Sequence, residues 1–214
     1  MSNASLNLLP TSLLAALSLS LGLTPTAGAQ TIAEINDETI FVNQSGATVQ
    51  PAISTQVGGV VGDLTFTTPA GSSLSFSEQT ALIPGTPDLA ISGVENLNIA
   101  IAAPVFSLGF QFVDVTDLPN STFDITLYSG GAGGSVVNTF NFESPKDVLH
   151  FGGFVSDTAF DYVEIREIGG DSSNEIFGQF YTGASAGKFW TLPSSGPWDG
   201  GGSWSGGTVP GVSD

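Results

Sequence analysis

The sequence has 214 residues, of which 41% are hydrophobic and only 11% are charged. The apolar content excludes wholesale disorder, and the low charge predicts a surface rich in glycine, hydroxyl and amide groups. Twenty Asp and Glu residues against three Lys and Arg give a net charge of -17, which disfavours binding to nucleic acid or to anionic membranes. Cysteine is absent, so disulfides and thiolate metal sites are excluded.

The first 29 residues have the pattern of a secretory signal peptide. A leucine-rich run, with no Lys or Arg before it, precedes Pro25, and a small-residue cleavage sequence ends at Ala29. We expect residues 1–29 to be removed, which makes the mature chain a secreted or cell-surface protein starting at Gln30. An N-terminal apolar anchor is the alternative. No later segment reaches about 20 uninterrupted apolar residues, so the mature chain is not expected to insert into a membrane.

The chain from residue 31 to residue 182 consists of short apolar or alternating stretches separated by Gly, Pro, Asn and Asp. Every second residue from Phe106 to Phe112 is Phe or Leu, which predicts a half-buried strand over residues 105–113. Residues 123–127 and 136–142 also alternate and flank a Gly-rich turn, so they are expected to form a hairpin.

Further strands are predicted at residues 39–43, 57–67, 96–102, 148–155, 160–167 and 175–181. In the hairpin, the alternation places Val136 on the same strand face as Phe140 and Phe142. No segment keeps a 3.6-residue apolar period for three turns, so helix should be scarce. The sequence therefore predicts an all-β fold, a single antiparallel β-sandwich of jelly-roll type, over residues 30–182.

The composition changes after Tyr181. Residues 183–214 are rich in Gly, Ser and Pro and contain three tryptophans, with few β-branched apolar residues. Such a segment cannot close a core alone. We interpret it as an irregular tail that is either a linker or the truncated start of a downstream β repeat.

Several motifs between residues 90 and 182 point to a known group of domains. They are the aromatic strand at 104–114, Phe-Asp-Ile-Thr-Leu-Tyr at 123–128, Phe-Gly-Gly-Phe-Val-Ser-Asp at 151–157, Phe-Asp-Tyr-Val-Glu-Ile-Arg at 160–166 and the aromatic strand at 177–181. In this order they resemble the extracellular β-sandwich domains of bacterial PEP-CTERM-type secreted proteins. The resemblance implies a lectin-like jelly roll outside the cell and no particular activity.

The tail departs from that group, because the Pro-Glu-Pro motif that defines its C-terminal signal is missing. Residues 198–214 instead resemble the opening of the Trp- and Gly-rich repeat units of autotransporter-like surface proteins. We expect the gene product to continue as a larger surface protein.

Catalytic residues are scarce. His150 is the only imidazole, and its place in an expected strand next to Phe151 favours a structural role over that of a general base. Tyr162, Glu164 and Arg166 share one strand face, where a carboxylate could serve a glycosidase or simply belong to a solvated surface. The sequence predicts a protein that is not an enzyme, with a polysaccharide-acting hydrolase as the least favoured alternative.

Two oxygen-rich runs could bind calcium. One contains Asp114 and Asp117, with Asn120 and Asp124 following, and the other contains Asp171, Asn174 and Glu175. Neither run has the spacing of a dedicated calcium loop, and both have the composition of turns. No cofactor is predicted, and a structural calcium ion is kept as an alternative.

Sugar binding would need exposed aromatic rings next to polar side chains. The candidates are Tyr128, Tyr162 and Tyr181, with Gln179 beside the last, and packing at the core or at a sheet edge is the alternative for all three rings. The sequence favours a non-catalytic extracellular module, structural or adhesive, with a carbohydrate-binding domain as the alternative. The expected partners are extracellular polysaccharides or cell-surface components.

Overall fold

The computed structural model of the chain describes residues 32–78, 82–83, 88–93, 96–115, 120–169 and 174–186. The predicted signal peptide and residues 187–214 of the predicted tail lie outside the described residues. The strands are β1 (Ile32–Ile35), β2 (Thr48–Val49), β3 (Val60–Val61), β4 (Leu64–Thr67), β5 (Ser72–Glu78), β6 (Asp88–Gly93), β7 (Leu97–Val115), β8 (Asn120–Ser129), β9 (Ser135–Pro145), β10 (His150–Gly169) and β11 (Asn174–Gly183). The described helices are α1 (Glu38–Ser45) and a single 3-10 turn at Ile53–Thr55.

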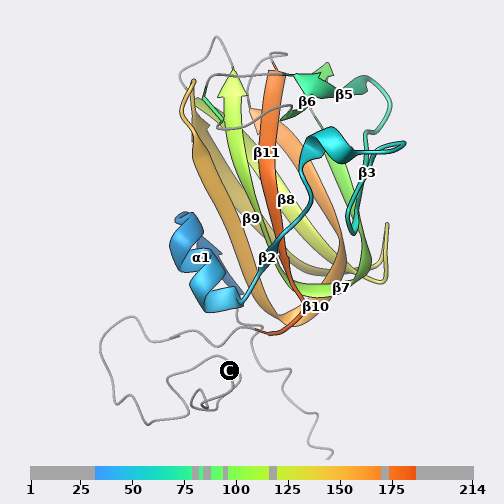
Figure 1. Cartoon of the computed structure of the whole chain (residues 1–214), viewed down its shortest axis with the longest axis vertical. Coiled ribbons are helices and arrows are strands. Elements are labelled where there is room, and N and C mark those ends of the chain that lie inside the picture. The colour runs from blue at the N-terminus through green and yellow to red at the C-terminus, as the bar shows by residue number, and fades with distance from the viewer. Residues whose placement is uncertain are drawn as a thin grey trace, which may run out of the picture.

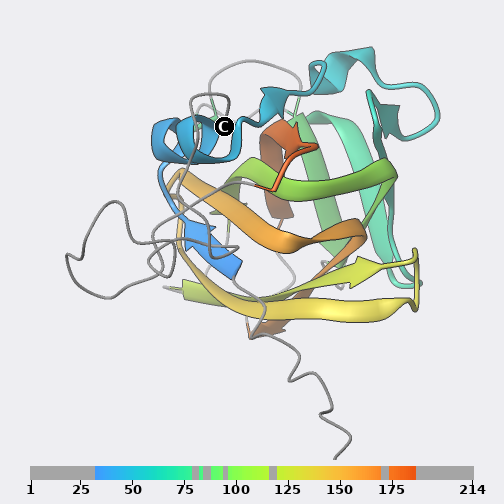
Figure 2. The same ribbon diagram turned by 90° about the horizontal axis from the view of Figure 1, so that it is seen from below.

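The strands form an antiparallel β-sandwich, which confirms the predicted fold class (Figure 1). The first sheet contains β5, β6, β11, the C-terminal half of β7, the N-terminal half of β10, and β1. The second sheet contains β4, the N-terminal half of β7, the C-terminal half of β10, β8 and β9. The two long strands β7 and β10 pass from one sheet to the other across the lower end of Figure 1, as the view from below also shows (Figure 2).

Irregular register marks the place where these two strands change sheets. The pairing of β10 with β7 shifts between Val155 and Phe160 and again before Tyr162. Bulges of this kind bend a strand and increase its twist. The sequence predicted four separate strands here, at 96–102, 105–113, 148–155 and 160–167, where the structure has two long, bent ones.

The core between the sheets combines aliphatic side chains with many phenylalanine rings. Ring centroids of Phe112 and Phe123, on opposite sheets, lie 5.2 Å apart, and those of Phe66 and Phe180 lie 4.9 Å apart. All four side chains are buried, and burial of each such ring stabilises the fold by roughly 1.5–3 kcal/mol. Without disulfides, this aromatic core holds the two sheets together.

The predicted hairpin is confirmed as β8 and β9, but its inward-facing residues differ near the turn. A bulge lets Leu127 pair with Asn138 while Tyr128 pairs with Val136, so Val137 is the extra residue. Val137 is therefore buried, and Val136, which strict alternation placed with the core residues, is 57% exposed.

The predicted strand at residues 39–43 is wrong, because this segment lies in helix α1. Asp37 caps the helix by accepting a hydrogen bond from the backbone N–H of Ile40, at 2.9 Å. Gly46 ends the helix with a φ of 62°, and its N–H donates to the carbonyl of Val42. The predicted strand at 57–67 is also interrupted, since Gly62 has a φ of 57° and separates β3 from β4.

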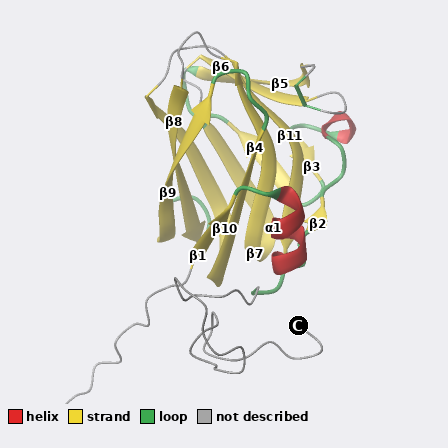
Figure 3. Cartoon of the chain, turned by 90° about the vertical axis from the view of Figure 1, so that its left-hand side faces the viewer, coloured by secondary structure: helices red, strands yellow, loops and turns green. Residues whose placement is uncertain are grey.

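Helix α1 packs on the outer side of the first sheet, against β7 and β10 (Figure 3). Phe41 is fully buried there, and its ring lies 5.3 Å from Phe151 and 6.5 Å from Tyr181. Within the described part of the chain, no helix is long and apolar enough to cross a membrane.

Candidate functional site

The outer face of the second sheet combines aromatic, charged and hydroxyl side chains, none of them fully buried. Strand register arranges these side chains in rows across the sheet. One row consists of Thr65, Ala100, Tyr162, Tyr128 and Val136. The next consists of Thr67, Asn98, Glu164, Thr126 and Thr139, and a third consists of Arg166, Asp124 and Asn141. We call this surface the tyrosine face.

Two tyrosines stand side by side at the centre of the first row. Tyr128 of β8 and Tyr162 of β10 are cross-strand partners, and their ring centroids lie 6.1 Å apart with the planes inclined at 63°. A ligand that stacks on one ring therefore meets the edge of the other. The exposed side chain of Val136 extends the apolar row beyond Tyr128.

A polar network fixes the side chains below the tyrosines. The Tyr128 hydroxyl donates to Glu164 Oε2 at 3.2 Å, and Arg166 Nη2 lies 3.1 Å from Glu164 Oε1. The same Nη2 donates to Asn98 Oδ1 at 2.6 Å, and Arg166 Nη1 donates to the carbonyl of Leu97 at 2.9 Å. Because the guanidinium is held at several points, the neighbouring carboxylate and amide keep a defined position.

The electrostatics of this network keep the tyrosines neutral. Burial raises the pKa of Tyr128, and the adjacent Glu164 carboxylate raises it further. Burial and Glu164 raise the pKa of Tyr162 in the same way. Both phenols therefore stay protonated through the neutral range and can donate hydrogen bonds. Among the described residues, Arg166 is the only cation on this face, where it is accompanied by Glu164 and Asp124, so the face does not favour anionic ligands.

Part of this arrangement was predicted from the sequence. The sequence placed Tyr162, Glu164 and Arg166 together from their spacing of two residues, and it singled out Tyr128 as an aromatic candidate. It missed Asn98 and Thr126, which flank Glu164 on the neighbouring strands. Their alternation with buried residues marked them as outward-facing, but only the strand order brings them next to Glu164.

Tyr181 and Gln179 do not belong to the tyrosine face. Both lie on β11 in the first sheet, and Tyr181 packs under helix α1, where its hydroxyl donates to Glu38. Burial and this hydrogen bond raise the pKa of Tyr181. Gln179 Nε2 donates to the carbonyl of Gln50 at 2.8 Å. These two side chains connect the first sheet to the segments that cover it.

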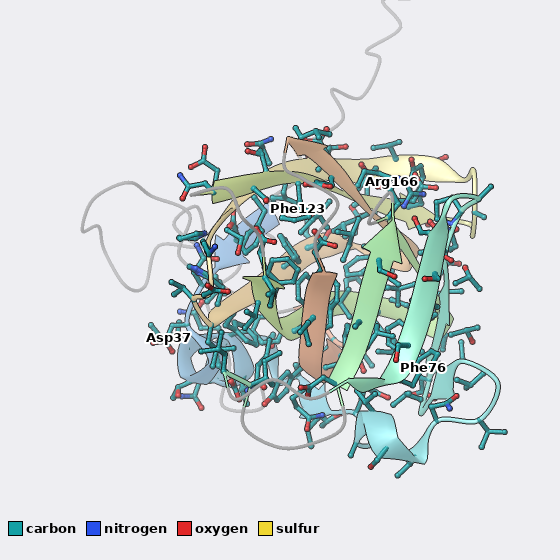
Figure 4. All side chains as sticks on the ribbon, turned by 90° about the horizontal axis from the view of Figure 1, so that it is seen from above. Asp37, Phe76, Phe123 and Arg166 are labelled. Carbon is teal, nitrogen blue, oxygen red and sulfur yellow. The ribbon has the colours of Figure 1, made fainter. Side chains whose placement is uncertain are left out.

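A hollow of about 310 Å³ lies at the N-terminal end of α1. Its lining includes Asn36, Asp37, Glu38 and Gln111. Asp37 is engaged as the helix cap, and Glu38 accepts hydrogen bonds from Tyr181 and, at 3.0 Å, from Gln111. These polar groups hold the helix on the sheet. Asp37 lies on the opposite side of the molecule from Arg166, as Figure 4 shows.

One described residue from each predicted calcium run lies at the upper end of the sandwich. Asp114 and Glu175, each from a different run, are cross-strand partners on β7 and β11, and both are buried. Asp117 and Asp171 lie outside the described residues, as does the side chain of Asn174. Among the residues that are described, no group of three or more His, Cys, Asp or Glu could hold a metal ion.

His150 is half-buried at the same end and lines the hollow beside α1. Its ring lies 6.2 Å from Phe142, its Nε2 atom is buried, and burial lowers the pKa of the imidazole. The sequence also contains a Gly-x-Ser-x-Gly pattern at 183–187, but Ser185 follows the end of β11 at the opposite end of the first sheet. The two residues therefore cannot act together as base and nucleophile.

Comparison with known proteins gives structural neighbours only. No family model and no curated protein matches the sequence. A variant of a family 29 carbohydrate-binding module aligns with 65% of this chain and 95% of its own, at 14% identity and a TM-score of 0.41. A family 29 module from Piromyces equi aligns with 72% of this chain and 91% of its own, at 11% identity and a TM-score of 0.39.

A third neighbour is the family 11 carbohydrate-binding module from Clostridium thermocellum, in complex with a β-1,3-1,4-mixed-linked tetrasaccharide. It aligns with 66% of this chain and 99% of its own, at 10% identity and a TM-score of 0.38. With TM-scores this low, the function has to be argued from the side chains of the tyrosine face.

Proposed function

We propose that this protein is a non-catalytic, extracellular carbohydrate-binding module and that the tyrosine face holds its ligand. The observation that carries the proposal is the contact between Tyr128 and Tyr162, one strand apart, beside the fixed Glu164, Arg166 and Asn98 side chains. Aromatic rings stack on the C–H faces of a sugar, and neighbouring carboxylate, amide and guanidinium groups bind its hydroxyls.

The arrangement also indicates which sugars fit. The tyrosine face carries one arginine, which is already paired with Glu164, and the whole chain has a net charge of -17. Acidic polysaccharides would be repelled by such a protein. Uncharged polysaccharides are the ligands that the face supports best.

A glycan array with neutral and acidic polysaccharides tests this function. The protein should bind one or more neutral glycans, and Tyr162→Ala should weaken that binding about tenfold, which corresponds to about 1.4 kcal/mol. Tyr181→Phe is the matched control, because Tyr181 lies under the helix on the other sheet, and it should leave the array pattern unchanged.

An array that stays silent for all neutral and acidic glycans would contradict the proposal. The protein would then fit the other role predicted from the sequence, a structural or adhesive module of a cell-surface protein. Binding to acidic glycans alone would leave the protein a carbohydrate-binding module, but it would exclude the tyrosine face as the ligand site.

A further inference from the structure

The interior of the sandwich changes from aromatic to polar at its upper end. Phe112 contacts Phe123, Phe142 and Phe177, with ring centroids 4.9 to 5.8 Å apart. Because strand side chains alternate, the residues two positions further toward the upper end point into the same interior. Those residues are Asp114, Ser121, Ser144 and Glu175. We call them the polar layer.

Each sheet contributes one pair to the polar layer. Asp114 and Glu175 are cross-strand partners in the first sheet, and Ser121 and Ser144 are cross-strand partners in the second. All four residues are at most 1% exposed. Packed sheets lie about 10 Å apart, a separation that phenylalanine fills and that serine and aspartate are too short to span. The polar layer therefore places oxygen atoms in the interior where the aromatic part of the core has rings.

The hydroxyl groups of the two serines call for a further binding partner. Within the described part of the chain, neither Ser121 Oγ nor Ser144 Oγ has a hydrogen-bond partner, although both atoms are buried. A buried hydroxyl without a partner destabilises a fold, and such groups call for a bound water or ion. The two serines are in register, and strand alternation points them into the same interior as the two buried carboxylates.

We propose that the polar layer binds a calcium ion that joins the two sheets. Calcium takes six to eight oxygen ligands, and carboxylates, hydroxyls and water all suit it. Glu175 can bind through both oxygens, Asp114 through one, and the two serines through their hydroxyls, with water in the remaining positions. The ion would also offset negative charge in a chain whose net charge is -17.

In the part of the chain that the structure describes, Lys146 is a rival for this role. Asp147 N–H donates to the carbonyl of Asp114 at 2.9 Å, which places the preceding residue, Lys146, near the polar layer. A lysine ammonium could supply positive charge to the carboxylates without any metal ion. The serines distinguish the two explanations, because only a bound ion requires them as ligands.

The test is calorimetric titration of the chelator-treated protein with calcium chloride, together with melting curves in calcium or in sodium chloride at matched ionic strength. A bound ion should raise Tm by about 5–10 °C once calcium exceeds its Kd a hundredfold. Sodium should not reproduce that rise. Asp114→Asn and Glu175→Gln should each lower calcium affinity at least tenfold, and Asp124→Asn on the outer surface should leave it unchanged.

Ser144→Ala gives a second, independent readout that does not depend on removing a charge. If Ser144 is a ligand, the variant should bind calcium more weakly but melt at a higher temperature than the parent in chelator, because a buried hydroxyl without a partner is gone. The proposal is overturned if calcium and sodium shift Tm equally, or if Ser144→Ala leaves calcium affinity unchanged. Loss of stability in Lys146→Gln, with no calcium effect in the parent, would assign the charge compensation to the lysine.

Discussion

The outer faces of the two sheets share the long strands β7 and β10, yet one face is covered by a helix and the other is open. On the first sheet, β7 and β10 present Gly109, Phe151 and Val155 to helix α1, and the face is covered. On the second sheet, the same strands present Asn98 and Tyr162, and the face stays open. Strand position therefore does not decide which face is covered; the outward-facing side chains do.

The covered face should lose the most stability when its contact with the helix is removed. Phe41→Ala deletes a fully buried ring that contacts Phe151 and Tyr181, so unfolding in urea should show a loss of about 3–5 kcal/mol. Ile40, its neighbour on the helix, is 47% exposed, and Ile40→Ala should change stability by about 0.5 kcal/mol or less. Equal losses in the two variants would mean that the helix does not pack as described.

The contact between helix α1 and the first sheet can also be disturbed by a substitution on strand β7. A Cβ atom at Gly109 would lie 2.6 Å from Phe151 Cζ and 2.7 Å from Phe41 Cε1, so Gly109→Ala should cost about 1–3 kcal/mol through overpacking. At Gly169 the nearest atoms would be 3.9 Å away, which makes Gly169→Ala a suitable control. Thermal unfolding of both variants measures the difference, and a neutral Gly109→Ala would show that the helix can move outward freely.

Because of Tyr181, the stability of the covered face should depend on pH in the alkaline range. Its phenol donates to Glu38, a bond to a charged group that is worth about 1.5 kcal/mol at neutral pH. Burial and this bond raise the pKa of Tyr181 above its ordinary value of 10.0. Above pH 10 the unfolded chain therefore loses the phenolic proton while the folded chain keeps it, and stability falls as pH rises.

Tyr181→Phe should lack this alkaline loss. Chemical unfolding at a series of pH values should show the parent more stable at neutral pH, with the advantage shrinking above pH 10. If the free energies of unfolding of the parent and Tyr181→Phe differ by the same amount at every pH, the hydrogen bond to Glu38 does not cause the difference.

The open face should contribute little to stability. Tyr162 is only partly buried and contacts Tyr128 at its edge, so Tyr162→Ala should reduce stability by about 1 kcal/mol or less while glycan binding weakens about tenfold. Circular dichroism melting curves measure the first effect. A loss as large as that of Phe41→Ala would make Tyr162 a structural residue and weaken the case for a ligand platform.

Most of the fold could be predicted because strand alternation is a local signal. Alternation and the Gly-rich turn predicted β8 and β9, and alternation also predicted the aromatic part of β7. Helix α1 was missed because eight residues are too few to show a helical period, and only its caps, Asp37 and Gly46, marked it. The bulge at Val137 has no sequence signature, so the residue that faces inward was misplaced by one position.

The sequence could predict which site residues share one strand face, but not which residues on different strands lie side by side. The spacing of Tyr162, Glu164 and Arg166 was sufficient to place them on one face. The pairing with Tyr128 depends on which strand lies beside β10, and the sequence does not encode that order locally. For the same reason Asp114 and Glu175, which lie in separate runs of the sequence, could not be recognised as neighbours.

The central claim is that the open face, and not the covered one, binds sugar. Nuclear magnetic resonance of isotope-labelled protein, titrated with the neutral oligosaccharide that the array identifies, tests it directly. The account predicts that the largest amide shift changes fall on Asn98, Thr126, Tyr128, Tyr162 and Glu164. Changes concentrated at Asp37, Glu38 and Gln111, in the hollow beside the helix, would contradict it.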